Sequence, residues 1–235
     1  MQKQFYFLSG LPRSGSTVLA AILNQHPDVH TSSTSGLLDV MFGTFQAWKS
    51  SMSSQADANE QAGEAEIKRI LRNVAEAKYA HVDKPIIIDK SRGWCQAQTM
   101  QVAADVFGEK PKIIATVRDV PDCAASFMRV MKPEDPEDFL RNHHFIKHLQ
   151  ESYQSLHSGY QLGPECILFV EYENLVADPQ TELDRIHTFL GLSEHSYDLA
   201  NIDGSTLAEK DEEVWEAPGL HTVQPVLQKL HDQSA

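Results

Sequence analysis

A glycine-containing loop directly follows the first apolar run of the chain, and its spacing is that of a phosphate-binding loop. It reads Gly10-Leu11-Pro12-Arg13-Ser14-Gly15-Ser16-Thr17 and leads into a helical pattern. Glycines let such a loop curl so that backbone N–H groups point inward, and the start of the helix adds positive potential. The pattern matches G-x-x-x-x-G-K-[ST], except that Ser16 stands where the lysine belongs. We therefore predict that Pro12 to Thr17 bind an anion shorter than a triphosphate, with Arg13 supplying the charge.

A second arginine stands where another apolar run ends. Arg118 follows the run 112–117, and Ser126 lies two helical turns further along the next helical pattern. A guanidinium fork together with a hydroxyl suits a terminal phosphate dianion. An arginine at a strand end is also a common salt-bridge residue, so the pair gains its meaning from the order in which it follows the first loop. Together the two motifs predict a ligand with two separate phosphates.

Four stretches of the chain resemble one known family. Arg13 and its neighbours, followed by Leu23-Asn24-Gln25-His26-Pro27-Asp28-Val29, are similar to the 5′-phosphosulfate loop of sulfotransferases that use 3′-phosphoadenosine 5′-phosphosulfate (PAPS). The tyrosylprotein-type and bacterial branches, in which an arginine replaces the loop lysine of cytosolic enzymes, look most similar. The other stretches are Asp89-Lys90-Ser91-Arg92-Gly93-Trp94, the segment 118–126, and the segment 170–192 that ends in Phe189-Leu190-Gly191-Leu192. The resemblance covers roughly residues 5–192.

The resemblance implies a role for several residues. Arg118 and Ser126 would form the 3′-phosphate site, which separates PAPS from ATP. Lys90 would bridge toward the transferring sulfonate and the leaving phosphate oxygen, where charge builds as the S–O bond breaks. Tyr172 would face the adenosine or a phosphate, and His221 lies where related enzymes fold a loop over the nucleotide. The co-substrate would be PAPS, and no metal is expected.

The implied reaction is an in-line displacement in which an acceptor hydroxyl or amine attacks sulfur and adenosine 3′,5′-bisphosphate leaves. A general base should take the acceptor proton. Tyrosylprotein-type enzymes carry a glutamate just after the segment that resembles 23–29, but here residues 31–36 contain no carboxylate. Asp39 is the favoured candidate, and His30 and Asp89 are alternatives. This departure argues against a peptidyl-tyrosine acceptor, and the acceptor stays open among small molecules, glycans and peptides.

The surrounding pattern predicts the elements that must position these residues. Short apolar runs predict buried strands at Phe5–Ser9, Pro85–Asp89, Lys112–Val117 and Cys166–Val170, with a further short strand near Val29–Thr31. Helical spacing is found at Ser16–Gln25, Glu64–Tyr79, Gln96–Phe107, Pro121–Val130, Glu137–His157 and Pro179–Leu190, the last ending at Gly191. We predict one domain over residues 1–235, an α/β fold with a parallel sheet between two helical layers, like that of P-loop NTPases. Ligands of such sheets bind at the carboxyl ends of the strands. The Ser- and Ala-rich stretch 50–66 predicts an exposed loop that runs into a helix, or a mobile flap.

Composition excludes several function classes. The formal net charge of −13 argues against nucleic-acid binding, which needs a basic surface. No apolar run has the roughly 18–20 residues that span a membrane, and no signal-peptide pattern is evident, so we expect a soluble cytoplasmic protein without a membrane partner. The three cysteines are far apart and suit a reducing compartment. The oligomeric state stays open.

Two rival functions remain. Asp89, at the end of an apolar run, could hold Mg²⁺ in a P-loop nucleoside or small-molecule kinase, although the loop lysine is missing. A nucleotide-binding protein without chemistry is the second rival, because the general base is not firmly placed. His143, His144 and His148 could suggest a metal site, but the pattern is more typical of a helix surface.

Overall fold

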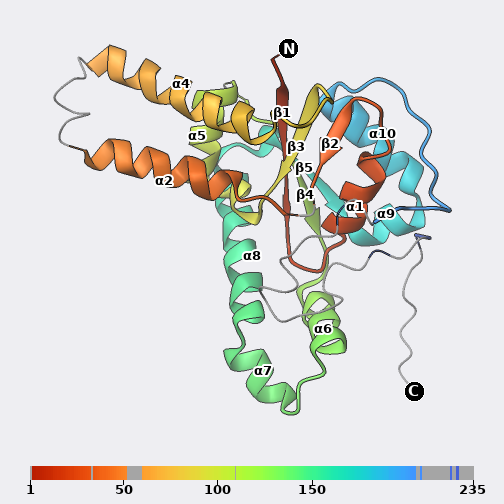
Figure 1. The fold of residues 1–235 in the computed structure, drawn as a ribbon. Coiled ribbons are helices and arrows are strands. Elements are labelled where there is room, and N and C mark those ends of the chain that lie inside the picture. The colour runs from red at the N-terminus through yellow and green to blue at the C-terminus, as the bar shows by residue number, and fades with distance from the viewer. Residues whose placement is uncertain are drawn as a thin grey trace.

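The computed structural model describes residues 2–32, 34–51, 60–108, 110–204, 207, 223, 226 and 227. Its centre is a five-stranded parallel sheet with strand order β2-β3-β1-β4-β5 (Figure 1). The strands are β1 (Gln4–Gly10), β2 (Val29–Thr31), β3 (Ile86–Lys90), β4 (Ile113–Val117) and β5 (Ile167–Glu171). Each lies within one or two residues of a strand predicted from the sequence.

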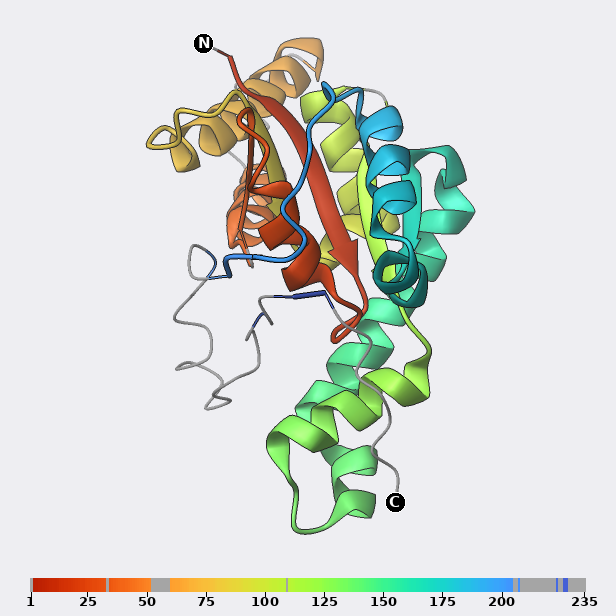
Figure 2. The same ribbon diagram turned by 90° about the vertical axis from the view of Figure 1, so that its right-hand side faces the viewer.

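Helices cover both faces of this sheet (Figure 2). Strand β1 shows why, because its side chains alternate between two separate cores: Phe5 and Phe7 point to one face, and Tyr6 and Leu8 point to the other. Parallel strands that are apolar on both sides require a helical layer on each. The predicted three-layer α/β/α fold is therefore confirmed.

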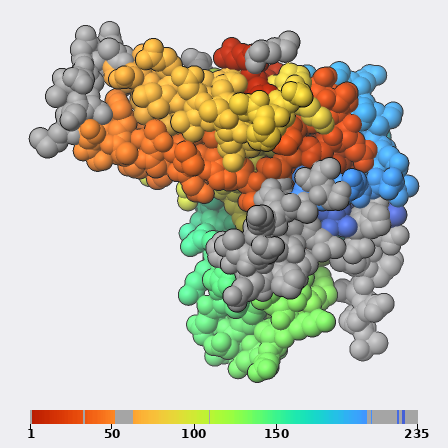
Figure 3. All heavy atoms as spheres, viewed as in Figure 1, coloured from red at the N-terminus to blue at the C-terminus, as the bar shows by residue number. Residues whose placement is uncertain are grey.

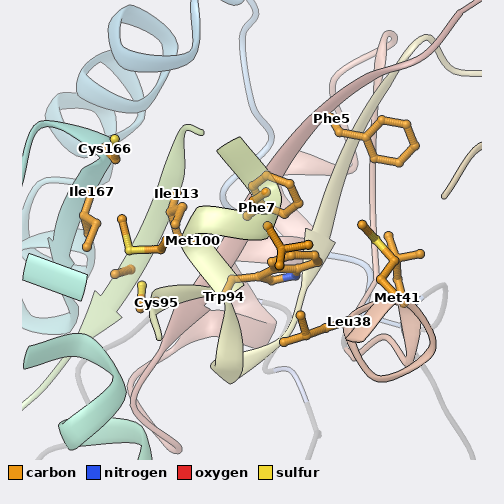
Figure 4. Close-up of a cluster of buried hydrophobic side chains, with 14 of the residues drawn as sticks. Phe5, Phe7, Leu38, Met41, Trp94, Cys95, Met100, Ile113, Cys166 and Ile167 are labelled. Atoms are coloured by element: carbon orange, nitrogen blue, oxygen red, sulfur yellow. The ribbon is translucent and has the colours of Figure 1, made fainter. Parts of the chain in front are cut away.

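The core on one face lies beneath four helices. They are α2 (Leu37–Ser50), α4 (Glu60–Lys78), α5 (Ala97–Phe107) and α8 (His144–Leu162), with the short 3₁₀ turn η1 (Arg92–Cys95) among them. Helices α2 and α4 pack along each other, as Figure 3 also shows. At the centre of this core the rings of Phe7 and Trp94 are 4.2 Å apart, with Leu38 and Met41 beside them (Figure 4).

The opposite face is covered by α1 (Ser16–Leu23), α9 (Tyr172–Ala177) and α10 (Pro179–Leu190). Buried side chains of α1 and α10 pack on Leu8 and on the matching residues of the neighbouring strands. Helix α10 ends at Gly191, which adopts the left-handed conformation at φ 75°, as the sequence predicts. This layer fixes α1, and so fixes the loop that leads into it.

Helices α6 (Val120–Met131) and α7 (Pro136–Asn142) form an arm with the first half of α8, which extends from the body of the molecule (Figures 1 and 2). The arm has its own small core of Phe127, Phe139, Phe145 and Ile146. Sequence spacing predicts one helix over Glu137–His157, and this prediction is wrong. The chain breaks at His143, whose backbone is extended and whose ring nitrogen Nδ1 accepts the N–H of Phe145, capping α8.

Two more predictions differ from the structure in detail. The helix predicted over Glu64–Tyr79 begins earlier, at Glu60, and residues 52–59 of the predicted flap lie outside the described residues. Helix α2 was not predicted, because Gly43 and several polar residues weaken its apolar pattern. In the described part of the chain, no helix combines the length and the apolar character needed to span a membrane.

Candidate active site

The polar residues of interest gather at the carboxyl ends of four neighbouring strands. Lys90 ends β3, the glycine loop follows β1, Arg118 follows β4, and Tyr172 follows β5. Strand register brings them level, since Leu8 pairs with Lys90 and Gly10 pairs with Thr116. This is the edge at which open parallel sheets bind ligands.

Close contacts of Gly10 and Ser14 hold the loop after β1 in place. Gly10 has φ 135°, and a Cβ there would lie 2.3 Å from the carbonyl oxygen of Thr116. The Ser14 hydroxyl is fully buried and donates toward the carbonyl oxygens of Leu11, at 2.6 Å, and Thr116, at 3.0 Å. Ser14 therefore fastens the loop with its side chain and can meet a ligand only through its backbone.

Helix α1 begins directly at this loop. Its N-cap is Gly15, in the left-handed conformation at φ 89°, and no side chain caps the helix. The first N–H groups of an α-helix have no partner within the helix and attract anions. The start of α1 at Ser16 and Thr17 therefore has the geometry that attracts an anion, at the position where the loop pattern predicts one.

Arg13 joins the loop to the arm. It adopts a positive φ of 67°, and its Nε donates to the Ser126 hydroxyl on α6 at 3.1 Å. Its guanidinium carbon lies 6.0 Å from the centre of the Phe127 ring. Two residues predicted to serve opposite ends of the ligand therefore touch each other, which sequence spacing could not reveal.

Lys90 is buried, with 5% of its surface exposed, although it carries a positive charge. Its Nζ lies 3.4 Å from the Thr17 hydroxyl, in the first turn of α1. The structure thus brings the lysine predicted to face the sulfonate to the edge of the loop that follows β1. The contact with Thr17 places the Lys90 ammonium group beside the first turn of α1.

Arg118 lies on the other side of the loop. Its guanidinium carbon is 4.5 Å from the centre of the Tyr172 ring, a cation–π contact. Carboxylates of Glu173 and Asp122 lie 3.5 and 3.7 Å from its nitrogens. Its buried Nε is the nitrogen that faces Glu173, and this contact is an ion pair without a hydrogen bond.

Tyr172 links Arg118 to the loop. A Cβ on Gly15 would lie 2.7 Å from Cδ2 of the Tyr172 ring, so only glycine allows this approach. The ring therefore packs between the loop and Arg118. Tyr172 was predicted as a ligand contact, and the structure gives it a second role as the support for both groups. The sequence analysis did not single out Glu173, which forms an ion pair with Arg118. An acidic residue directly after Tyr172 was the sequence signal for this partner.

Asp89 is fully buried on β3, and both of its carboxylate oxygens are bonded. Tyr79 donates its hydroxyl to Oδ2 at 2.5 Å, and the Trp94 indole donates to Oδ1 at 2.7 Å. Burial raises the pKa of this carboxyl, and the hydrogen bonds from Ser35, Tyr79 and Trp94 oppose the rise. A carboxylate enclosed in this way is not placed to take a proton from a bound acceptor.

The other two candidate bases lie in different surroundings. Asp39 is exposed in the first turn of α2. His30 is half-buried on β2, its ring 5.8 Å from that of Tyr79. Burial lowers the pKa of His30, and the charge of Lys84 lowers it further. Of the three, Asp39 alone is a carboxylate open to solvent.

The remaining predictions concern His221 and three histidines of the arm. His221 lies outside the described residues. His143, His144 and His148 lie on the arm, where the rings of His143 and His144 stack at 4.3 Å. In the part of the chain that the structure describes, no group of three or more His, Cys, Asp or Glu side chains could hold a metal ion.

Comparison with known proteins identifies the family. A family model described as "Sulfotransferase family" matches residues 6–196. The chain belongs to the sulfotransferase family. A Caenorhabditis briggsae protein described as "Putative protein-tyrosine sulfotransferase" is 26% identical to this chain over 197 residues, which are 81% of this chain and 66% of the other. The chain thus spans slightly less than two thirds of that relative's length.

Solved structures share the fold of this sulfotransferase. The sulfotransferase domain of the Synechococcus PCC 7002 olefin synthase superposes with a TM-score of 0.56 at 23% identity, covering 96% of this chain and 90% of that one. A sulfotransferase from Alicyclobacillus acidocaldarius gives 0.55 at 18% identity, covering 91% and 90%. At these identities the similarity establishes the arrangement of strands and helices.

Proposed function

We propose that this sulfotransferase moves the sulfonate group of PAPS to a hydroxyl or amine of a small-molecule, glycan or peptide acceptor and releases adenosine 3′,5′-bisphosphate. The observation that carries the proposal is the grouping of Arg13, Lys90 and Arg118 around one loop in a protein of net charge −13. Positive groups that converge on one pocket can bind a small anion even when the whole molecule is acidic.

The site offers a place for each end of the co-substrate. Arg118 and Ser126 would hold the 3′-phosphate, and the position of the Arg118 guanidinium beside Tyr172 and the loop supports this. The backbone N–H groups from Pro12 to Thr17 and the Arg13 guanidinium would hold the 5′-phosphosulfate. Tyr172 would support the nucleotide from beside Arg118. His221 is proposed as a further contact on the basis of the sequence resemblance alone.

In the reaction, a bond forms between the acceptor oxygen or nitrogen and sulfur while the bond from sulfur to the bridging phosphate oxygen breaks. The electron pair of the broken bond goes to that oxygen, which becomes part of a phosphate dianion. Lys90 and Arg13 would stabilise this growing charge, and they act in a partly desolvated site where such stabilisation is strongest. We propose Asp39 as the base that takes the acceptor proton.

The surroundings of Asp89 favour this proposal over a kinase. A kinase of this scaffold needs a carboxylate at the end of β3 to hold Mg²⁺. Here Tyr79 and Trp94 donate to both Asp89 oxygens. The residue that would serve a kinase is therefore engaged in holding the fold.

Calorimetry and a transfer assay test the proposal together. Adenosine 3′,5′-bisphosphate should bind more tightly than AMP, and turnover of labelled PAPS on an acceptor panel should persist in EDTA. Tight binding of ATP–Mg²⁺ without binding of the bisphosphate would overturn the proposal in favour of a kinase. Binding of the bisphosphate without turnover on any acceptor would favour a non-catalytic nucleotide-binding protein.

The proposal includes a cytoplasmic location without nucleic-acid or membrane partners. Cys95, Cys123 and Cys166 are all unpaired and buried, which suits a reducing compartment. The net charge of −13 opposes contact with nucleic-acid phosphates.

A further inference from the structure

A buried carboxylate lies directly beside the lysine of the candidate active site. Asp89 has no exposed surface and precedes Lys90 at the end of β3. Successive side chains of a strand point to opposite faces, so the two residues serve different layers. Lys90 reaches Thr17 on α1, whereas Asp89 contacts Tyr79 and Trp94 in the layer of α2 and α4.

The Asp89 carboxyl is also linked to the start of α2, through Tyr79. The Tyr79 hydroxyl, which donates to Asp89, also contacts the hydroxyl of Ser35, one residue before the N-cap Gly36. The same hydroxyl accepts the backbone N–H of Leu37, the first residue of the helix, at 3.1 Å. Ser35 therefore connects the buried carboxylate to the first turn of α2, which carries Asp39.

This link depends on Tyr79, which follows α4. Its hydroxyl lies 3.4 Å from the Ser35 hydroxyl and donates to Asp89. Asp89 is thus bonded by Tyr79, at the end of α4, and by Trp94 of η1, and Tyr79 connects it to the loop before α2. A buried carboxylate needs such donors, and breaking one of these bonds leaves it poorly satisfied.

We infer that Asp89 is a positioning residue that fixes the first turn of α2 relative to Lys90. It holds the side of the site where Asp39 would take the acceptor proton, while its neighbour Lys90 faces the leaving group. Its function would thus be to set the distance between Asp39 at the acceptor and Lys90 at the leaving group. The catalytic part of this inference rests on the proposed function, but the structural link from Asp89 through Ser35 to α2 can be tested without it.

The structural test uses hydrogen exchange in Asp89→Asn, Ser35→Ala and the double variant. Asp89→Asn should speed exchange of the amides at residues 37–40 by about fivefold, the equivalent of about 1 kcal/mol for one hydrogen bond. The effect should largely vanish in the Ser35→Ala background, because interacting residues are not additive. Equal acceleration in both backgrounds, or none in either, would overturn the link.

A second measurement avoids any variant at the buried carboxylate. Ser35→Ala should shift the NMR signal of the Trp94 indole N–H, because Ser35 contacts Tyr79, and Tyr79 and Trp94 donate to the same Asp89 carboxylate. Ser50→Ala is the matched control, since it removes a hydroxyl at the far end of α2 that donates to the carbonyl oxygen of Ala47. An unmoved Trp94 signal in Ser35→Ala would contradict the inference even if Asp89→Asn does not fold.

The functional test separates turnover from nucleotide binding. In Ser35→Ala and Asp89→Asn, kcat should fall by about fivefold or more for the loss of one hydrogen bond, while the Kd for adenosine 3′,5′-bisphosphate stays within about twofold. Equal losses in both quantities would show that Asp89 acts through the nucleotide site and would overturn the inference. If the wild-type protein transfers no sulfonate, the proposed function fails, and the exchange and NMR results still decide the structural link.

Discussion

The guanidinium of Arg118 lies over the ring of Tyr172, 4.5 Å from its centre, and the other edge of that ring packs against Gly15. One aromatic side chain thus separates and supports the two places where phosphates are proposed to bind. Gly15, Arg118 and Tyr172, which follow β1, β4 and β5, are therefore in contact with one another at this edge of the sheet.

Replacing Arg118 with alanine should weaken binding of adenosine 3′,5′-bisphosphate by about 10- to 150-fold, the equivalent of about 1.5–3 kcal/mol for a charge-assisted hydrogen bond. Binding of AMP, which has no 3′-phosphate, should change little. Calorimetry with both nucleotides measures the difference. Arg141→Ala is the control, since Arg141 is an exposed arginine on α7 that pairs with Glu137. Equal weakening for AMP would show that Arg118 does not contact the 3′-phosphate.

Replacing Gly15 with alanine should damage both stability and binding. The added Cβ would lie 2.7 Å from Tyr172, and φ 89° is unfavourable for any residue with a side chain. Gly43→Ala in α2 is the matched control, because its Cβ would meet nothing within 4 Å. That control should stabilise the fold by about 0.5–1 kcal/mol. Thermal unfolding of both variants provides the comparison, and a Gly15→Ala protein as stable as wild type would argue against the packing described.

Arg13 and Ser126 should be energetically coupled. Arg13→Ala and Ser126→Ala each remove one partner of the 3.1 Å hydrogen bond. If both groups bind one ligand, their effects on the Kd of adenosine 3′,5′-bisphosphate should differ from additivity by about 0.5–3 kcal/mol. A double-mutant cycle measured by calorimetry tests this. Strict additivity would place the two residues in independent sites.

Replacing Lys90 with methionine should reduce kcat far more than it weakens binding of adenosine 3′,5′-bisphosphate. Methionine preserves the buried stem, so the change removes the charge that would stabilise the leaving oxygen. A loss of about 100-fold or more in kcat is typical when one such group is removed. The assay is single-turnover transfer from labelled PAPS, and an unchanged rate would exclude Lys90 from the reaction.

The sequence was sufficient to predict the strands and the residues at their carboxyl ends, because buried parallel strands leave short apolar runs and loops leave glycines. It could not predict that Arg13 touches Ser126, since those residues are brought together by packing of the arm on the loop. The sequence also could not predict the role of Ser14. A serine in a glycine loop has the same pattern whether its hydroxyl faces a ligand or, as here, the carbonyl of Thr116.

The role of Asp89 could not be predicted from the sequence either. An acid that ends an apolar run has the pattern of a metal ligand or a base. Its actual partners, Tyr79 and Trp94, stand ten residues before it and five residues after it, on elements that only the tertiary fold brings to its carboxylate. The break at His143 was missed for a local reason, since one side-chain cap ended a helical period that otherwise continues.

A group of histidines should make the fold sensitive to acid. His187 and His195 lie around the buried His26, with ring centres 5.7 and 5.1 Å from it, and they join the turn after α1 to the last turn of α10 and the segment that follows it. Burial is the main cause that lowers the pKa of both His187 and His195, and His26 lowers it further. For His187 the carboxylate of Asp184 opposes the shift, and for His195 the charge of Lys84 adds to it.

The sign of the effect follows from these directions. The folded protein keeps His187 and His195 neutral at a pH where the unfolded chain, with a pKa of about 6.5, already takes up protons. The free energy of unfolding should therefore be constant above about pH 7.5 and fall as the pH drops through about 6.5. Denaturant titrations at pH 7.5, 6.5 and 5.5 measure it. His195→Gln should make the fall smaller, whereas His157→Gln, at an exposed position on α8, should leave it unchanged. A stability that rises on acidification to the same extent in all three proteins would contradict this account.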